Sequence, residues 1–330
     1  MNGAGSAAAP WGVWLVLAAS VLWGTTGTAA TFAPGVSPLA IGAIAMGLGG
    51  LLQAAIAART IIASAGFLRS RWPTVALGSV AVAAYPLAFY SSMHLAGVAV
   101  GTVVSIGSAP LASAVIERVV DKRRFTLRWA TGAVLGVTGA VLLCFAEAGT
   151  ADPASATDAA WSAPAGIGLG LVAGITYALY SWAAHRLIST GAPSSAVMGA
   201  VFGIGGLLLM PVLAATGAPL VASWQNLSVG LYMALVPMFA GYVLFGLGLA
   251  RIRASTATTI SLAETVVAAI LAVVVVGERL PAMAWAGAAL VAGSLFVLTL
   301  PTPRKREVPA EETQASSSQP VPAARPGSTA

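Results

Sequence analysis

Long apolar runs follow one another along the 330-residue chain and constrain its fold more than any other feature. Each run approaches the about 20 residues that an α-helix needs to cross a bilayer. Only 8% of the residues are charged and 58% are hydrophobic, whereas a soluble domain usually has about 25% charged residues. We therefore predict an all-α integral membrane protein. Ten segments qualify as transmembrane helices: residues 11–30, 38–58, 73–93, 98–119, 128–146, 165–187, 194–215, 228–250, 255–276 and 284–301.

The basic residues are sorted to one side of this scheme. If both termini share a side, that side holds all 16 lysines and arginines except Arg279. Cytoplasmic loops carry the Lys and Arg excess in membrane proteins, so we predict a multi-pass protein of the plasma membrane with both termini in the cytoplasm. The absence of basic residues before the first run favours a retained first span over a cleaved signal peptide. Because the basic residues are dispersed between apolar runs, we expect no nucleic-acid partner.

The second half of the chain repeats the first. "LAASVLWGTTGTAA" from Leu17 matches the spacing of "LVAGITYALYSWAA" from Leu171, and "GAVLGVTGAVLL" from Gly132 resembles "GAALVAGSLFVL" from Gly287. Five spans occur twice, and an odd number of spans makes the second copy inverted in the membrane, an architecture of many secondary transporters. We predict a first repeat over residues 1–149, an external loop over 150–164, a second repeat over 165–301 and a disordered cytoplasmic tail over 302–330.

Three stretches carry a resemblance to a known family: "MHLAGVAVGTVVSIGSAPLASAVIERVV", "ITYALYSWAAHRL" and "ARIRASTATTISLAETVVAAILAVVVVGERL". They resemble the drug/metabolite transporter (DMT) superfamily, EamA type. The resemblance implies a ten-helix carrier with cytoplasmic termini and a central cavity lined by helices one to four and six to nine. Its members move amino acids, other small metabolites or drugs, commonly outward.

The chain departs from the family at one motif. The family often has Glu-Pro in the ninth span, where this chain has Glu264 and Thr265. The fourth span keeps its proline, Pro110, but has Ala109 in place of an acid. Since proline is the usual cause of a helix kink, we expect a kink in the fourth helix and have no such reason to expect one in the ninth.

Glu264 is the first candidate for a functional residue, because a charged side chain at mid-bilayer costs roughly 2.5–3.5 kcal/mol on insertion scales. It should therefore face a cavity or a partner, with Ser261 on the same helix face. Two interpretations stay open: a carboxylate that binds a proton or a substrate amine, and a carboxyl group that fastens two helices together. The other spans have no Lys or Arg at membrane depth, which leaves a proton, water or a cationic substrate as its partner.

Aromatic residues with polar tips are the next candidates for a solute site. Tyr177 and Tyr180 share one face of the sixth span, and Trp23 occupies the position in the first repeat that matches Tyr177. Such rings suit small organic solutes or cations. Tyr85 lies deep in the third span and is a weaker candidate. The alternatives are an interfacial belt for Tyr180 and ordinary packing for Trp23.

Other polar residues near the ends of the spans are interpreted as interfacial. His185 fits a belt at the cytoplasmic interface, and Tyr90 and His94 fit anchors at the outer end of the third span. Glu117 lies beside Arg118 in a charged stretch, and we expect a solvated helix end there rather than a gate.

These features together predict a secondary transporter of small metabolites, an exporter driven by the proton gradient or by exchange. Its partners would be a small-molecule substrate, protons and the lipid bilayer. We expect no cofactor, metal or catalytic residue, since the chain has no nucleotide-binding G-x-x-x-x-G-K-[ST] and no H-E-x-x-H. A non-transporting scaffold or receptor is the alternative, and an intramembrane enzyme would need a nucleophile or metal cluster that the sequence lacks. The sequence leaves the substrate, the direction of transport and the oligomeric state open.

Overall fold

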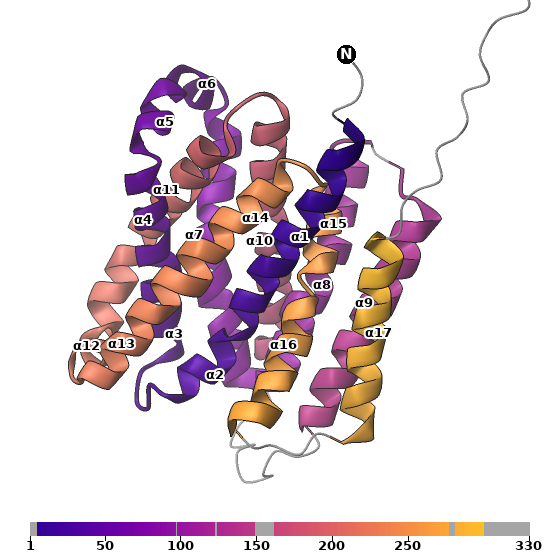
Figure 1. Cartoon of the computed structure of the whole chain (residues 1–330). Coiled ribbons are helices and arrows are strands. Elements are labelled where there is room, and N and C mark those ends of the chain that lie inside the picture. The colour runs from indigo at the N-terminus through magenta and orange to yellow at the C-terminus, as the bar shows by residue number, and fades with distance from the viewer. Residues whose placement is uncertain (1–4, 97, 123, 149–161, 277–280, 300–330) are drawn as a thin grey trace, which may run out of the picture. The chain divides into compact units, whose positions relative to one another are not determined.

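The computed structural model describes residues 5–96, 98–122, 124–148, 162–276 and 281–299, and every regular element in these ranges is a helix (Figure 1). The first half contains α1 (Gly5–Gly24), α2 (Thr26–Thr31), α3 (Pro38–Gly42), η1 (Ala43–Leu48), α4 (Gly49–Ile56), α5 (Ala58–Ala63), α6 (Ala65–Ser70), α7 (Trp72–Ala96), α8 (Val98–Val119) and α9 (Leu127–Ala148). The second half contains α10 (Ser162–Ser189), α11 (Ser194–Thr216), α12 (Ala218–Val221), α13 (Trp224–Met233), η3 (Ala234–Ala240), α14 (Gly241–Leu249), α15 (Ala254–Ile260), α16 (Ala263–Leu271), η4 (Ala272–Val276) and α17 (Ala282–Thr299). The η segments are π-helical.

The helices identify a multi-pass membrane protein. Among the described residues, seven continuous or nearly continuous helices are long and apolar enough to cross a bilayer. Two shorter apolar helices, Leu127–Leu142 and Ala282–Leu298, coincide with the predicted fifth and tenth segments, and α8 coincides with the fourth. The all-helical membrane fold is thereby confirmed, and ten crossings stays a prediction.

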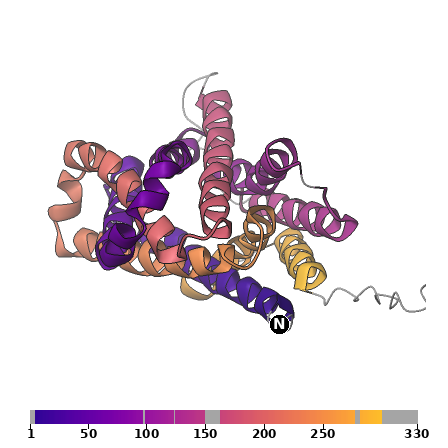
Figure 2. The ribbon, with the colours of Figure 1, turned by 90° about the horizontal axis from the view of Figure 1, so that it is seen from above.

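The two halves of the chain interlock. α10 packs along both α7 and α8, α11 packs on α4, α14 packs on α1, and α17 packs along α9. Viewed from above, α9 and the yellow α17 lie at the side of the bundle opposite to α12 and α13 (Figure 2). Each of these pairs joins a helix of the first half to one of the second, so the core lies between the halves.

Glycine permits the closest of these approaches. A Cβ atom on Gly50 of α4 would lie only 2.2 Å from the backbone oxygen of Phe202 in α11. A Cβ atom on Gly136 of α9 would lie 2.9 Å from Oγ of Ser294 in α17. Small residues that let backbones approach are the usual means by which helices associate in a membrane.

The ninth segment is interrupted where no proline predicted it. α15 ends at Ile260 and α16 begins at Ala263, and the amides of Leu262, Glu264 and Thr265 bond to carbonyl oxygens three residues back at 3.3, 3.0 and 3.1 Å. These are 3₁₀-type bonds, which tighten the chain locally. α8 instead continues through Pro110 as one helix. The kink at Pro110 stays a prediction, whereas the ninth segment, for which no kink was expected, is interrupted beside Glu264.

Candidate functional site

A central cavity of about 40 Å³ lies between the two halves of the chain. Its aromatic wall consists of Trp23, Tyr85, Phe89, Tyr90, Tyr177 and Tyr242. Met46 and Met238 line it as well, and Glu264 supplies its carboxylate. A space of this size has room for a few water molecules where polar groups such as Glu264 line it. The site thus combines several aromatic faces and adaptable thioethers with one acidic group.

Glu264 owes its position to the interruption of the ninth segment. It lies in the first turn of α16, where the unpaired amides of a helix N-terminus favour negative charge. The residue is half-buried and borders the cavity. Within the described part of the chain, no hydrogen bond or ion pair reaches its carboxylate. The carboxylate is therefore available to a solute, to water or to a proton in the cavity.

Tyr177 connects the cavity wall to the turn before Glu264. Its hydroxyl donates a 2.8 Å hydrogen bond to Oγ of Ser261, which in turn donates to the backbone oxygen of Thr258 at 2.9 Å. The Tyr177 ring lies 5.5 Å from the ring of Tyr85, between centroids. Both tyrosines thus present ring surface to the cavity, while Ser261 lies behind Tyr177 and is fully buried.

Trp23 is fixed by a hydrogen bond to the other half of the chain. Its indole Nε1–H donates to the backbone oxygen of Pro237 at 2.9 Å, within the π-helical η3. Its ring lies 4.8 Å from that of Tyr242 and 5.2 Å from that of Phe245. π-helical insertions occur often at functional sites, and here one supplies the acceptor that orients an aromatic wall residue.

A buried aromatic layer lies on one side of the cavity. The hydroxyls of Tyr180 and Tyr242 share a 2.7 Å hydrogen bond. The ring of Phe202 packs 4.5 Å from that of Tyr242 and 5.5 Å from that of Tyr180. Along α10, Tyr180 lies between Tyr177, which lines the cavity, and the charged end of the helix at Arg186. Tyr180 thus lies nearer to that end of α10 than Tyr177 does.

The predicted site residues come together in two groups. Trp23, Tyr85, Tyr177 and Glu264 line the cavity, and Tyr180 and Ser261 form hydrogen bonds directly behind its wall.

Sequence reasoning missed two tyrosines of the wall. Tyr90 borders the cavity rather than anchoring the interface, whereas the exposed His94 remains consistent with an anchor. Tyr242 was not among the predicted residues, because Trp23 was selected by its match to Tyr177 in the repeat, while Tyr242 was not compared with any residue of the first half. Its polar-tipped ring within the apolar run "MFAGYVLFGLGL" is a signal that could have found it.

A second cavity, of about 270 Å³, lies at the end of the bundle where Arg71, Arg186 and Arg253 meet. We call this end the basic end. In Figure 1 it is the upper end, with α5, α6 and the connection between α14 and α15, while α2, α12 and α13 lie at the lower end. Glu117 and Asp121 border the same cavity.

Glu117 and His185 differ from their expected environments. Glu117 is only 3% exposed, which corrects the expectation of a solvated helix end. Its carboxylate accepts hydrogen bonds from the amide and the hydroxyl of Ser255, at 2.9 and 2.8 Å. Nδ1 of His185 lies 2.7 Å from the backbone oxygen of Leu249, so the imidazole links α10 to α14 instead of serving only as a belt residue.

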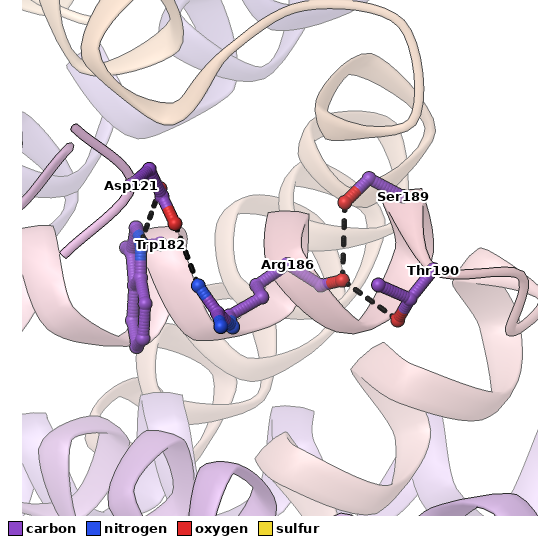
Figure 3. A network of polar contacts seen from close by, with 5 residues as sticks. All are labelled: Asp121, Trp182, Arg186, Ser189 and Thr190. Carbon is purple, nitrogen blue, oxygen red and sulfur yellow. Dashed lines mark hydrogen bonds and ion pairs between the residues drawn. The ribbon is translucent and has the colours of Figure 1, made fainter. Parts of the chain in front are cut away.

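Asp121 connects α8 to α10 at the same end. It accepts hydrogen bonds from Nε1 of Trp182 at 2.8 Å and from Arg186 at 2.6 Å (Figure 3). Figure 3 also shows the hydroxyls of Ser189 and Thr190 bonded to the backbone oxygen of Arg186. Across the ranges that the structure describes, no cluster of three His, Cys, Asp or Glu side chains could hold a metal ion.

Comparison with known proteins agrees with this architecture. The model of the EamA-like transporter family matches residues 10–145 and 164–300. The uncharacterized transporter YwfM of Bacillus subtilis (strain 168) is 35% identical over 293 residues, which cover 88% of this chain and 94% of that protein. A solved crystal structure, titled only as that of a protein, aligns with a TM-score of 0.65 at 20% identity, over 87% of this chain and 95% of the other. That likeness concerns the fold alone.

The family is one of transporters, which excludes an enzyme as the primary identity of the chain and confirms the resemblance found in the sequence. By the extent of the family match and by its identity to YwfM, the chain belongs to the EamA-like transporter family.

Proposed function

We propose that this protein is a secondary transporter of a small organic solute that bears an amino or other cationic group, such as an amino acid, a related metabolite or a drug. The observation that carries the proposal is the position of Glu264, whose carboxylate borders a cavity walled by aromatic rings and has no protein partner among the described residues. A cation over an aromatic face gains about 0.5–2 kcal/mol. A carboxylate beside such faces adds a charge-assisted hydrogen bond.

Transport would be coupled to protons by competition for one carboxylate. A carboxyl group in a membrane is tolerated when it is neutral, paired or hydrated. A proton and a cationic solute each neutralise Glu264, so they would occupy the site alternately. Exchange of the two across the membrane gives an exporter driven by the proton gradient.

The proposed membrane arrangement follows the predicted repeats. Ten transmembrane helices would form two inverted repeats, over residues 1–149 and 165–301, with 150–164 outside and 302–330 as a cytoplasmic tail. The basic end would face the cytoplasm of the cell, and the protein would lie in the plasma membrane. The gathering of Arg71, Arg186 and Arg253 at that end supports this orientation.

The conformation described here would be closed toward the basic end. The layer of Tyr180, Tyr242 and Phe202 lies between the central cavity and that end, and all three side chains are buried. A cavity of about 40 Å³ is smaller than an amino acid needs, so binding would require the wall to move apart. The methionines of the wall, Met46 and Met238, have the side-chain flexibility for such adjustment.

A flux screen in proteoliposomes tests the proposed function. The purified protein would be assayed with radiolabelled amino acids and organic cations, with and without a pH gradient, beside the Glu264→Gln variant and empty liposomes. We expect saturable flux of at least one amine-bearing solute, stimulated by an opposing proton gradient. Flux that is confined to uncharged or anionic solutes would contradict the proposal.

A further inference from the structure

The end of α8 is tied to the second half of the chain by two carboxylates. Glu117 accepts two hydrogen bonds from Ser255 at the start of α15. One turn later, Asp121 accepts hydrogen bonds from Trp182 and Arg186 of α10 (Figure 3). Both acids border the cavity at the basic end. The helices α8, α10 and α15 all contact one another.

The two ties differ in expected strength. The side chains of Arg186 and Asp121 are 43% and 24% exposed, and partly solvated ion pairs contribute little to stability. Glu117 is 3% exposed and Ser255 is 2% exposed. Hydrogen bonds to a charged group removed from water are stronger, and loss of one partner leaves a buried polar group unsatisfied. The Glu117–Ser255 contact is therefore the stronger tie.

Further hydrogen bonds follow α15 toward Glu264. Oγ1 of Thr258 donates to Oγ of Ser113 at 3.2 Å, one turn below the Glu117 contact. The Tyr177–Ser261 bond comes next, at the turn between α15 and α16. Ser255, Thr258 and Ser261 recur every three residues and are all buried. These polar contacts tie α15 to α8 and the turn after α15 to α10.

We infer that Glu117 is the gating residue at the basic end: its carboxylate holds α15 against α8 and must release Ser255 before the central cavity opens to that end. This inference rests on the proposed transport function. Glu117 borders the 270 Å³ cavity, so a small displacement would bring its charge into water. The contact is strong while it is shielded from water, and in the open conformation water donors replace the two donors of Ser255, which offsets part of the cost of release. A hydrogen bond buried far from any cavity would have no water donors to replace the protein donors when it breaks.

The inference is tested by the rate at which a buried cysteine reacts with a thiol reagent, and the test needs no substrate. The single cysteine, Cys144, is replaced by Ala. A reporter cysteine is placed at Ala109, which is fully buried on the same face of α8 as Ser113 and Glu117. A membrane-impermeant thiol reagent is applied to the basic end in oriented vesicles. We expect Glu117→Gln to accelerate labelling about tenfold, the factor that corresponds to one hydrogen bond to a charged group.

Arg118→Gln provides the matched control, because Arg118 is exposed on the next position of α8 and its loss also changes one charge. We expect no change in Ala109→Cys labelling for this variant. Asp121→Asn should give a smaller increase than Glu117→Gln. Ser255→Ala keeps the amide donor and loses only the hydroxyl, so it should shift labelling in the same direction by a lesser factor. If Glu117→Gln fails to reach the membrane, Ser255→Ala still tests the inference.

A second reporter distinguishes a gate from general loosening. Thr26 borders the central cavity, and Thr26→Cys is labelled from the opposite side of the membrane. A shift toward the conformation open at the basic end should reduce this labelling while labelling at position 109 rises. A rise at both positions, or no change at either in Glu117→Gln and Ser255→Ala, would overturn the inference. Failure of the proposed function would appear separately, as absence of amine flux in the unmodified protein.

Discussion

Tyr177 and Ser261 are joined by a 2.8 Å hydrogen bond that ties α10 to the turn between α15 and α16. Glu264 lies three residues after Ser261, and its amide donates a hydrogen bond to the backbone oxygen of Ser261. The contact thus connects the aromatic wall of the cavity to the turn that precedes the carboxylate. Disturbing it should alter both the stability of the fold and the placement of Glu264.

The two partners of this hydrogen bond should respond unequally to substitution. Tyr177→Phe removes the donor, and Ser261 still donates to Thr258, so the expected cost is about 0.5–1.5 kcal/mol. Ser261→Ala leaves the hydroxyl of Tyr177 buried without its acceptor, at about 1–3 kcal/mol. Thermal unfolding in detergent should therefore rank Ser261→Ala as less stable than Tyr177→Phe. The double variant should be no less stable than Ser261→Ala, and strictly additive losses would show that the two residues do not act as a pair.

Close packing of α1 on α16 should make Gly24 intolerant of a side chain. A Cβ atom there would lie 2.6 Å from Cβ of Val267 and 2.8 Å from the backbone oxygen of Glu264. Overpacking of this kind costs about 1–3 kcal/mol, so Gly24→Ala should lower the melting temperature and weaken substrate binding. Gly27→Ala is the matched control, because a Cβ atom at Gly27 would meet nothing within 4 Å. Equal stability and binding in the two variants would argue against this packing.

The distribution of basic residues predicts the orientation of the chain. A peptide tag after Ala330 should be inaccessible to external reagents in intact cells and become accessible after permeabilisation. A cysteine introduced between residues 150 and 160, in the Cys144→Ala background, should react with an impermeant reagent from outside. Labelling of the tag in intact cells, with the loop cysteine protected, would reverse the proposed orientation.

The helical membrane fold could be predicted from the sequence because apolar runs of bilayer length allow few alternatives. The involvement of Trp23, Tyr85, Tyr177 and Glu264 in one cavity could also be predicted, from polar atoms placed in apolar spans. The interruption beside Glu264 could not, since it depends on 3₁₀-type bonds at a turn without proline or glycine.

The role of Glu117 was equally hidden in the sequence. Its neighbour Arg118 suggested solvent, and its environment is set by Ser255, which lies 138 residues further along the chain. Pairing across such a distance is decided by the packing of α8 on α15 and leaves no local signal. Tyr90 shows the same limit, because its position near the end of a span does not reveal which way α7 presents it.

The central claim is that Glu264 binds a cationic solute and a proton at one site. Its ionised form attracts the solute and its protonated form does not, so the apparent KM of the wild type should rise as pH falls. Glu264→Gln should insert normally, transport weakly and lose this pH dependence, while Ser261→Ala should keep it because the carboxylate remains. The decisive measurement is initial flux of an amine-bearing substrate against pH for wild type and Glu264→Gln at matched protein levels in proteoliposomes. The account predicts a pH-dependent KM in the first and a pH-independent, low rate in the second. Identical rates and pH profiles would contradict it and would make Glu264 a structural residue.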